Sequence, residues 1–164
     1  MRWSKLKRLV EDRFAPSIAK RFALHSTVYG NCTCGHAWLT LDGDVIANFC
    51  TRAYYNREWE ESSAGTVFVP DGAIQRRYEG QAVEYGEFGR KDVYSACWDF
   101  IHELSFDDAL ASDNPLILAL AVLDQRLGKR RISKVYEGAQ HPLVKRLLEV
   151  RMEAEGVPVR AVGV

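Results

Sequence analysis

The chain has 164 residues, and its 22 basic and 22 acidic side chains give a formal net charge of zero. That length suits one compact domain with a sizeable core, and the neutral balance argues against a dedicated nucleic-acid-binding protein, which is typically strongly basic. No apolar run approaches the roughly 20 residues that a bilayer span requires, and no signal peptide is visible. We therefore expect a cytoplasmic protein without membrane association, whose four cysteines are reduced thiols.

The charges are unevenly distributed along the chain. Residues 1–21 carry 7 basic and 2 acidic side chains, 42–108 carry 6 and 14, and 109–164 carry 9 and 6, whereas 22–41 carry none. We expect the basic ends to pair with the acidic middle inside the fold. The alternative is a separate basic face that attracts a charged partner.

The N-terminal part predicts a helix followed by strands. Apolar residues recur at helical spacing over 4–14, and 22–29 alternates weakly, as a strand does. The segments 36–41 and 45–50 flank Asp42-Gly43-Asp44. Because Asp-Gly is a strong signal for a tight turn, they predict a hairpin.

The region 52–90 has no clear period. Tyr54-Tyr55-Asn56-Arg57 and several glycines indicate loops, which often carry function. A further strand is predicted over Thr66–Val69, before Pro70-Asp71-Gly72.

A buried helix is the clearest feature of the C-terminal part. Eight apolar residues, 116–123, cover every side of two turns, so neighbours must surround this helix. Asn114 is a natural N-cap and Pro115 suits the first helical position. Gly128 is expected to close the helix in a left-handed conformation.

Three further helices flank the buried one. Helical spacing predicts one over 91–104, with Cys97 on its apolar face. Ser105 is expected to cap a short helix that ends at Ala111, and a last helix runs over 142–155 and ends at Gly156. Strands therefore precede helices, which favours the α+β class over alternating βαβ units.

These elements predict a single α+β domain over 1–164. A helix and a hairpin sheet occupy 1–70, and a helical part occupies 90–156. The small antiparallel sheet is expected to pack with the C-terminal helical bundle around one core.

A possible zinc site lies at the predicted hairpin. Cys32, Cys34 and His36 alternate along one strand face and Cys50 ends the partner strand, and zinc prefers thiolate and imidazole ligands. With a two-residue turn the four side chains cannot meet, whereas a three-residue loop places His36 opposite Cys50. The alternative is small thiols packed around a turn, and on that reading we expect no cofactor.

No motif of an established catalytic class is present. His102-Glu103 lacks the second histidine of a zinc-protease helix, since Phe106 stands three residues after the glutamate. We therefore favour a protein that is not an enzyme.

Two groups of residues have the character of a binding surface. The first mixes cations with rings on which single-stranded nucleic acid stacks, and consists of Arg52, Tyr54, Tyr55 and Arg57. The second is basic and consists of Lys129, Arg130, Arg131 and Lys134. It could contact phosphates together with Lys5, Lys7 and Arg8, or simply offset the unpaired carbonyls at the end of the buried helix.

Three strings of the sequence are too specific to be accidents of composition. They are Met1-Arg2-Trp3-Ser4-Lys5-Leu6-Lys7, Cys32-Thr33-Cys34-Gly35 with Ala37-Trp38, and Asp113-Asn114-Pro115-Leu116 continuing to Leu127-Gly128-Lys129-Arg130-Arg131. They resemble an uncharacterised family of small bacterial cytosolic proteins. The resemblance covers most of the chain and implies a bacterial, cytosolic, single-module protein, but it brings no catalytic residue with it.

These features predict a non-enzymatic binding or regulatory protein whose partner is another protein. One alternative is the binding of RNA or single-stranded DNA through the basic N- and C-terminal segments. The other is a zinc-binding module or metal-dependent enzyme at Cys32, Cys34 and His36. The sequence leaves the oligomeric state open.

Overall fold

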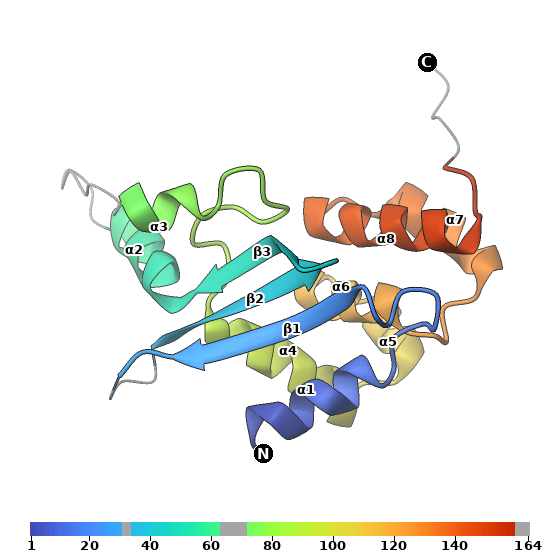
Figure 1. Cartoon of the computed structure of the whole chain (residues 1–164), viewed down its shortest axis with the longest axis horizontal. Coiled ribbons are helices and arrows are strands. Elements are labelled where there is room, and N and C mark those ends of the chain that lie inside the picture. The colour runs from blue at the N-terminus through green and yellow to red at the C-terminus, as the bar shows by residue number, and fades with distance from the viewer. Residues whose placement is uncertain (31–33, 63–71, 160–164) are drawn as a thin grey trace. The chain divides into compact units, whose positions relative to one another are not determined.

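The computed structural model describes residues 1–30, 34–62 and 72–159, which form eight helices and three strands (Figure 1). The fold class is α+β, as predicted. The chain divides into two compact units, a helical unit of Met1–Arg21 with Ala96–Val164 and a sheet unit of Phe22–Ser95. Among the described helices, none combines the length and the apolar composition that crossing a bilayer requires.

The sheet unit contains one antiparallel sheet in the order β1–β2–β3 (Figure 1). The strands are β1 (Phe22–Val28), β2 (Gly35–Leu41) and β3 (Asp44–Cys50), which confirms the predicted first strand and the hairpin. Asp42 and Gly43 have φ angles of 52° and 93°. Positive φ at both positions is the requirement of a two-residue type I′ turn, which explains the Asp-Gly pair.

The register of the hairpin changes beyond the turn. Thr40 pairs with Val45, but Leu39 pairs with Ala47. One extra residue in β3 therefore forms a β-bulge, and the bulge shifts every later pair by one position. It brings His36 opposite Cys50, the pairing that the sequence allowed only with a longer loop.

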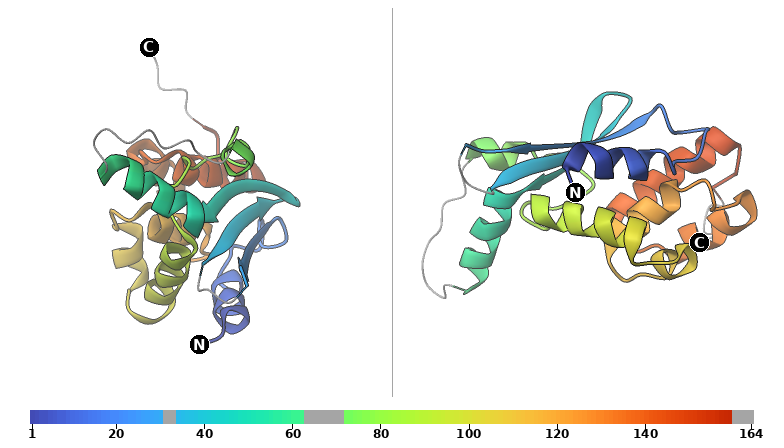
Figure 2. Two further views of the ribbon diagram at one scale, coloured as in Figure 1. Left: turned by 90° about the vertical axis from the view of Figure 1, so that its left-hand side faces the viewer. Right: turned by 90° about the horizontal axis from the view of Figure 1, so that it is seen from below.

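Two helices follow β3, namely α2 (Thr51–Ser62) and α3 (Gly72–Arg76). Figure 2 shows α2 leaving the end of β3 at a steep angle to the strands. The prediction of loop for Tyr54–Arg57 was wrong, because these residues lie in α2. The helix is held by contacts from far along the chain: Gly86 lies against Ala53 and Arg57. The predicted strand over 66–69 falls outside the described residues.

The helix predicted over 91–104 is α4 (Arg90–His102). Its residues Ala96, Cys97 and Phe100 are buried. Burial, reinforced by the charge of Glu11, raises the pKa of the Cys97 thiol to about 12. A thiol that stays protonated in an apolar setting behaves as a core residue, as predicted.

The remaining helices belong to the helical unit. They are α1 (Trp3–Glu11), α5 (Phe106–Leu110), α6 (Pro115–Leu123), α7 (Lys129–Gly138) and α8 (Pro142–Glu155). The predicted caps are confirmed, since Ser105 accepts a hydrogen bond from the Asp108 amide and Asn114 accepts one from the Leu116 amide. Gly156, at φ 67°, ends α8 in the left-handed conformation.

A buried arginine of α8 holds the end of α6 in place. Arg151 is only 1% exposed. Its Nη1 donates to the carbonyls of Val122 and Asp124 at 2.7 and 2.6 Å, its Nη2 donates to the carbonyl of Leu127, and its Nε donates to Glu155 at 2.9 Å. The last carbonyls of a helix have no partner within that helix. Arg151 supplies such partners at the end of α6 and fixes the segment that leads into α7.

Gly128 does not close the buried helix, contrary to the prediction. Its φ is −74°, and it is the N-cap of α7, while α6 ends at the C-cap Asp124. The basic residues Lys129, Arg130 and Arg131 therefore lie in the first turn of α7 and not behind a helix C-terminus. Positive charge is unfavourable at that end of a helix, so their position needs another explanation.

Candidate functional site

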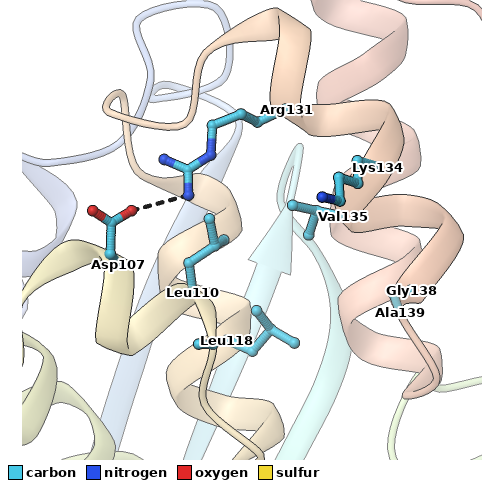
Figure 3. A pocket seen from close by; sticks show the side chains of 9 residues that line it. Asp107, Leu110, Leu118, Arg131, Lys134, Val135, Gly138 and Ala139 are labelled. Atoms are coloured by element: carbon cyan, nitrogen blue, oxygen red, sulfur yellow. Dashed lines mark hydrogen bonds and ion pairs between the residues drawn. The ribbon is translucent and has the colours of Figure 1, made fainter.

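A pocket of about 360 Å³ opens on the helical unit, with walls from α5, α6 and α7 (Figure 3). Its size lies at the lower end of the range of about 300–1,000 Å³ that is usual for ligand pockets. We call it the α5–α7 pocket. It is lined by Asp107, Leu110, Ala111, Leu118, Arg131, Lys134, Val135, Gly138 and Ala139.

The floor of the α5–α7 pocket explains an exception in the buried helix. Leu116, Ile117 and residues 119–123 of α6 are buried, as an all-round apolar helix requires. Leu118 is half-buried instead, and it lines the pocket beside Leu110 of α5 (Figure 3). The surface left uncovered on α6 is therefore the apolar floor of this pocket.

The rim of the pocket is charged. Arg131 reaches from α7 across to α5, where its Nη2 donates to Asp107 at 2.9 Å (Figure 3). Its guanidinium also lies 5.8 Å from the centre of the Phe106 ring, within cation–π range. Lys134, one turn further along α7, is exposed and has no ion-pair partner among the residues that the structure describes. Two cations thus face one carboxylate.

The α7 wall has a spacing that could have been read from the sequence. Arg131, Lys134, Val135 and Gly138 occupy positions i, i+3, i+4 and i+7, which is one face of a helix. The sequence reasoning missed this face because it placed a helix end at Gly128 and treated the basic residues as a trailing group. No local sequence pattern identifies Asp107 and Leu118 as pocket residues, because only the packing of α5 and α6 brings them to α7.

In the structure the other predicted basic residues lie at separate places. Lys129 donates to the carbonyl of Glu155 at 2.9 Å, so it compensates the C-terminal end of α8. Arg130 is exposed and does not line the pocket. On α1, Lys7 pairs with Glu11 at 2.8 Å. Figure 1 shows α1 and α7 apart, so the two basic segments do not form one surface.

The group predicted on 52–57 does not form one surface either. Arg52 and Tyr55 share one side of α2 and Tyr54 and Arg57 share another, because positions three apart are neighbours on a helix. Arg52 and Tyr55 are exposed, the latter by 57%. Arg57 pairs with Glu84 at 3.3 Å. A hydrogen bond to Glu58 raises the pKa of Tyr54.

The predicted zinc ligands are only partly described. His36 lies opposite Cys50, but its Nε2 is within hydrogen-bond distance of the Asn48 side-chain oxygen. Cys34 is half-buried, Cys50 is buried, and Cys32 falls outside the described residues. Among the residues that the structure describes, no three histidine, cysteine or acidic side chains are placed to hold a metal ion.

One face of the sheet carries a row of stacked rings. Trp38 lies between His25, at 5.0 Å between ring centres, and His36, at 4.8 Å. Burial lowers the pKa of His36 despite its contact with Asn48, and the charge of Arg77 lowers it further, so the neutral ring is favoured. Stacking with the two histidines occupies the indole of Trp38, the largest of the three rings, and so limits its use as a platform for nucleic-acid bases.

Comparison with known proteins identifies the family of the chain. No curated protein and no solved structure matches the chain. Residues 2–152 match the SF0329 protein family. This match covers nearly the whole chain and agrees with the resemblance that the sequence motifs carry. The chain belongs to the SF0329 protein family.

Proposed function

We propose that the protein is a non-enzymatic binding protein of the bacterial cytoplasm, and that it takes a short segment of a partner protein in the α5–α7 pocket. The cytoplasmic setting is supported by the resemblance to bacterial cytosolic proteins. The pocket has the composition of a recognition site, in which apolar walls supply affinity and a few charged groups fix orientation.

The half-buried side chain of Leu118 carries this proposal. Every other residue of the run 116–123 is buried, so the fold covers α6 on all sides except at the pocket. When a ligand buries an exposed leucine side chain, the free energy of the complex falls by about 25 cal/mol per Å² of apolar area removed from water. A partner side chain that fills the pocket would complete the burial of α6.

The arrangement of the cations favours a protein partner over nucleic acid. Affinity for RNA or DNA rests on many simultaneous phosphate contacts. Lys7 and Lys129 are each engaged by an acidic side chain or a helix-end carbonyl within the fold. Two cations at the rim of an apolar pocket suit a few carboxylates better than a phosphate backbone.

Affinity capture with a pocket variant tests the proposal. Leu118→Glu places a charge on the apolar floor, and we expect it to abolish capture of the partner that the wild-type chain retains from an extract of the host. The reason is that the new carboxylate removes the apolar contact of Leu118 and competes with the partner for Arg131 and Lys134, which line the same pocket. Quantitative mass spectrometry of the captured proteins gives the comparison.

Val45→Glu is the matched control. Val45 is 42% exposed on the hairpin of the sheet unit and does not line the pocket, so the substitution adds the same charge at a residue outside it. Circular dichroism verifies that both variants are folded. A partner retained equally by Leu118→Glu and by Val45→Glu would contradict the proposal.

A further inference from the structure

Asp107 occupies the place that a ligand carboxylate would take. It stands in the first turn of α5 and accepts a hydrogen bond from Arg131 at 2.9 Å. The two side chains are exposed by 78% and 52%. Exposed ion pairs are weak, so this pair can be exchanged for another at little cost.

We infer that the partner segment carries carboxylates on either side of an aliphatic residue, and that one of these carboxylates replaces Asp107 at Arg131. This inference rests on the proposed function of the α5–α7 pocket. It specifies the chemistry of the partner as an acidic, leucine-bearing segment and makes Asp107 an internal competitor for the site.

The second cation sets the spacing of the partner's charges. Arg131 and Lys134 are three residues apart on α7, so their Cβ atoms are about 5–6 Å apart. In an extended segment, side chains two residues apart lie about 6–7 Å apart on one side, and the side chain between them points to the other side. A Glu-Leu-Glu segment would thus direct its carboxylates to α7 and its leucine to Leu110 and Leu118.

The charges at the rim make Asp107 compete with the carboxylates of the partner. Arg131 and Lys134 contribute two positive charges and Asp107 contributes one negative charge. A partner with two carboxylates neutralises both cations, but it must then displace Asp107 or accept its repulsion. Removing the charge of Asp107 should therefore strengthen binding, which is opposite to the result expected if Asp107 itself contacted the partner favourably.

Titration of synthetic peptides into the full chain tests the inference. The probe is an acetylated and amidated nonapeptide with Glu-Leu-Glu at its centre, flanked by glycine and serine. We expect it to bind roughly tenfold more tightly than its Gln-Leu-Gln and Glu-Ser-Glu counterparts, because each loses charge-assisted hydrogen bonds or apolar burial. Equal affinity for the three peptides would overturn the inference.

Substitutions in the chain give the second readout. We expect Asp107→Asn to tighten binding of the Glu-Leu-Glu peptide about threefold or more and Arg131→Gln to weaken it about tenfold. Asp113→Asn and Arg130→Gln make the same changes of charge outside the pocket and should leave the affinity within about twofold. Weaker binding by Asp107→Asn would overturn the inference.

The outcomes separate this inference from the proposed function. Loss of partner capture in Leu118→Glu combined with equal affinity for all peptides leaves the pocket as the docking site and refutes the acidic partner. A short single-stranded RNA that displaces the Glu-Leu-Glu peptide refutes both. A dimer of the wild-type chain that dissociates in the Leu118→Glu variant also refutes both, because the pocket would then bind a second copy of the chain.

Discussion

Replacement of Arg151 by alanine is expected to lower the free energy of unfolding by about 3–5 kcal/mol. The substitution removes all four hydrogen bonds of the buried guanidinium. It leaves the carbonyls of Val122, Asp124 and Leu127 without this donor and Glu155 without its arginine partner. Urea titration followed by circular dichroism measures the loss.

Two comparisons assign this effect to the guanidinium. Arg146→Ala removes an exposed arginine from the same helix and should change the stability by no more than about 0.5 kcal/mol. Arg151→Lys keeps the charge but lacks the planar fork that reaches several acceptors, so it should recover little of the loss. A loss below about 1 kcal/mol in Arg151→Ala would show that other contacts hold the end of α6.

Replacement of Gly86 by alanine is expected to cost about 2–4 kcal/mol. Gly86 has a φ of 69°, which is strained for a residue with a Cβ. The added carbon would also lie 2.5 Å from the carbonyl oxygen of Ala53 and 2.8 Å from the Cβ of Arg57. One of these backbones must move, which loosens α2. Thermal or urea unfolding measures the change.

Gly80→Ala separates backbone strain from steric contact. Gly80 has nearly the same φ, 70°, but no atom lies within 4 Å of the position of its Cβ. Only the conformational cost of about 1–2 kcal/mol then remains. Equal losses in the two variants would mean that the close packing of Gly86 on α2 contributes nothing.

Local rules predicted the elements whose ends are set by neighbouring residues. Asn114 with Pro115, Ser105 and Gly156 act as caps through hydrogen bonds or dihedral angles within a few residues. The turn at Asp42-Gly43 follows from the φ values of its own two residues. Such features need no knowledge of the rest of the fold.

Predictions failed where contacts with residues far along the chain determine the local structure. Arg151, more than twenty positions away, supplies a donor for the carbonyls at and beyond the end of α6, so the chain does not need the left-handed glycine that Gly128 suggested. In the same way, α2 is supported by contact with Gly86, although its own sequence resembles a loop. Tertiary contacts override weak local preferences in both places.

The candidate site was predicted in part. Arg131 was singled out for its charge, and Lys134 was noted beside it, but their pairing with an apolar floor depends on how α5, α6 and α7 pack. The half-buried Leu118 inside an otherwise buried run could not be told from its neighbours by composition alone. The other predicted groups, on α2 and at the hairpin, do not line this pocket.

Mapping of amide chemical shifts in the isotope-labelled full chain tests the central claim most directly. On addition of the captured partner or the Glu-Leu-Glu peptide, we expect the largest shifts at the residues that line the α5–α7 pocket, with Leu118 and Arg131 among them. Shifts confined to the stacked rings around Trp38, or to Arg52 and Tyr55 on α2, would contradict the account.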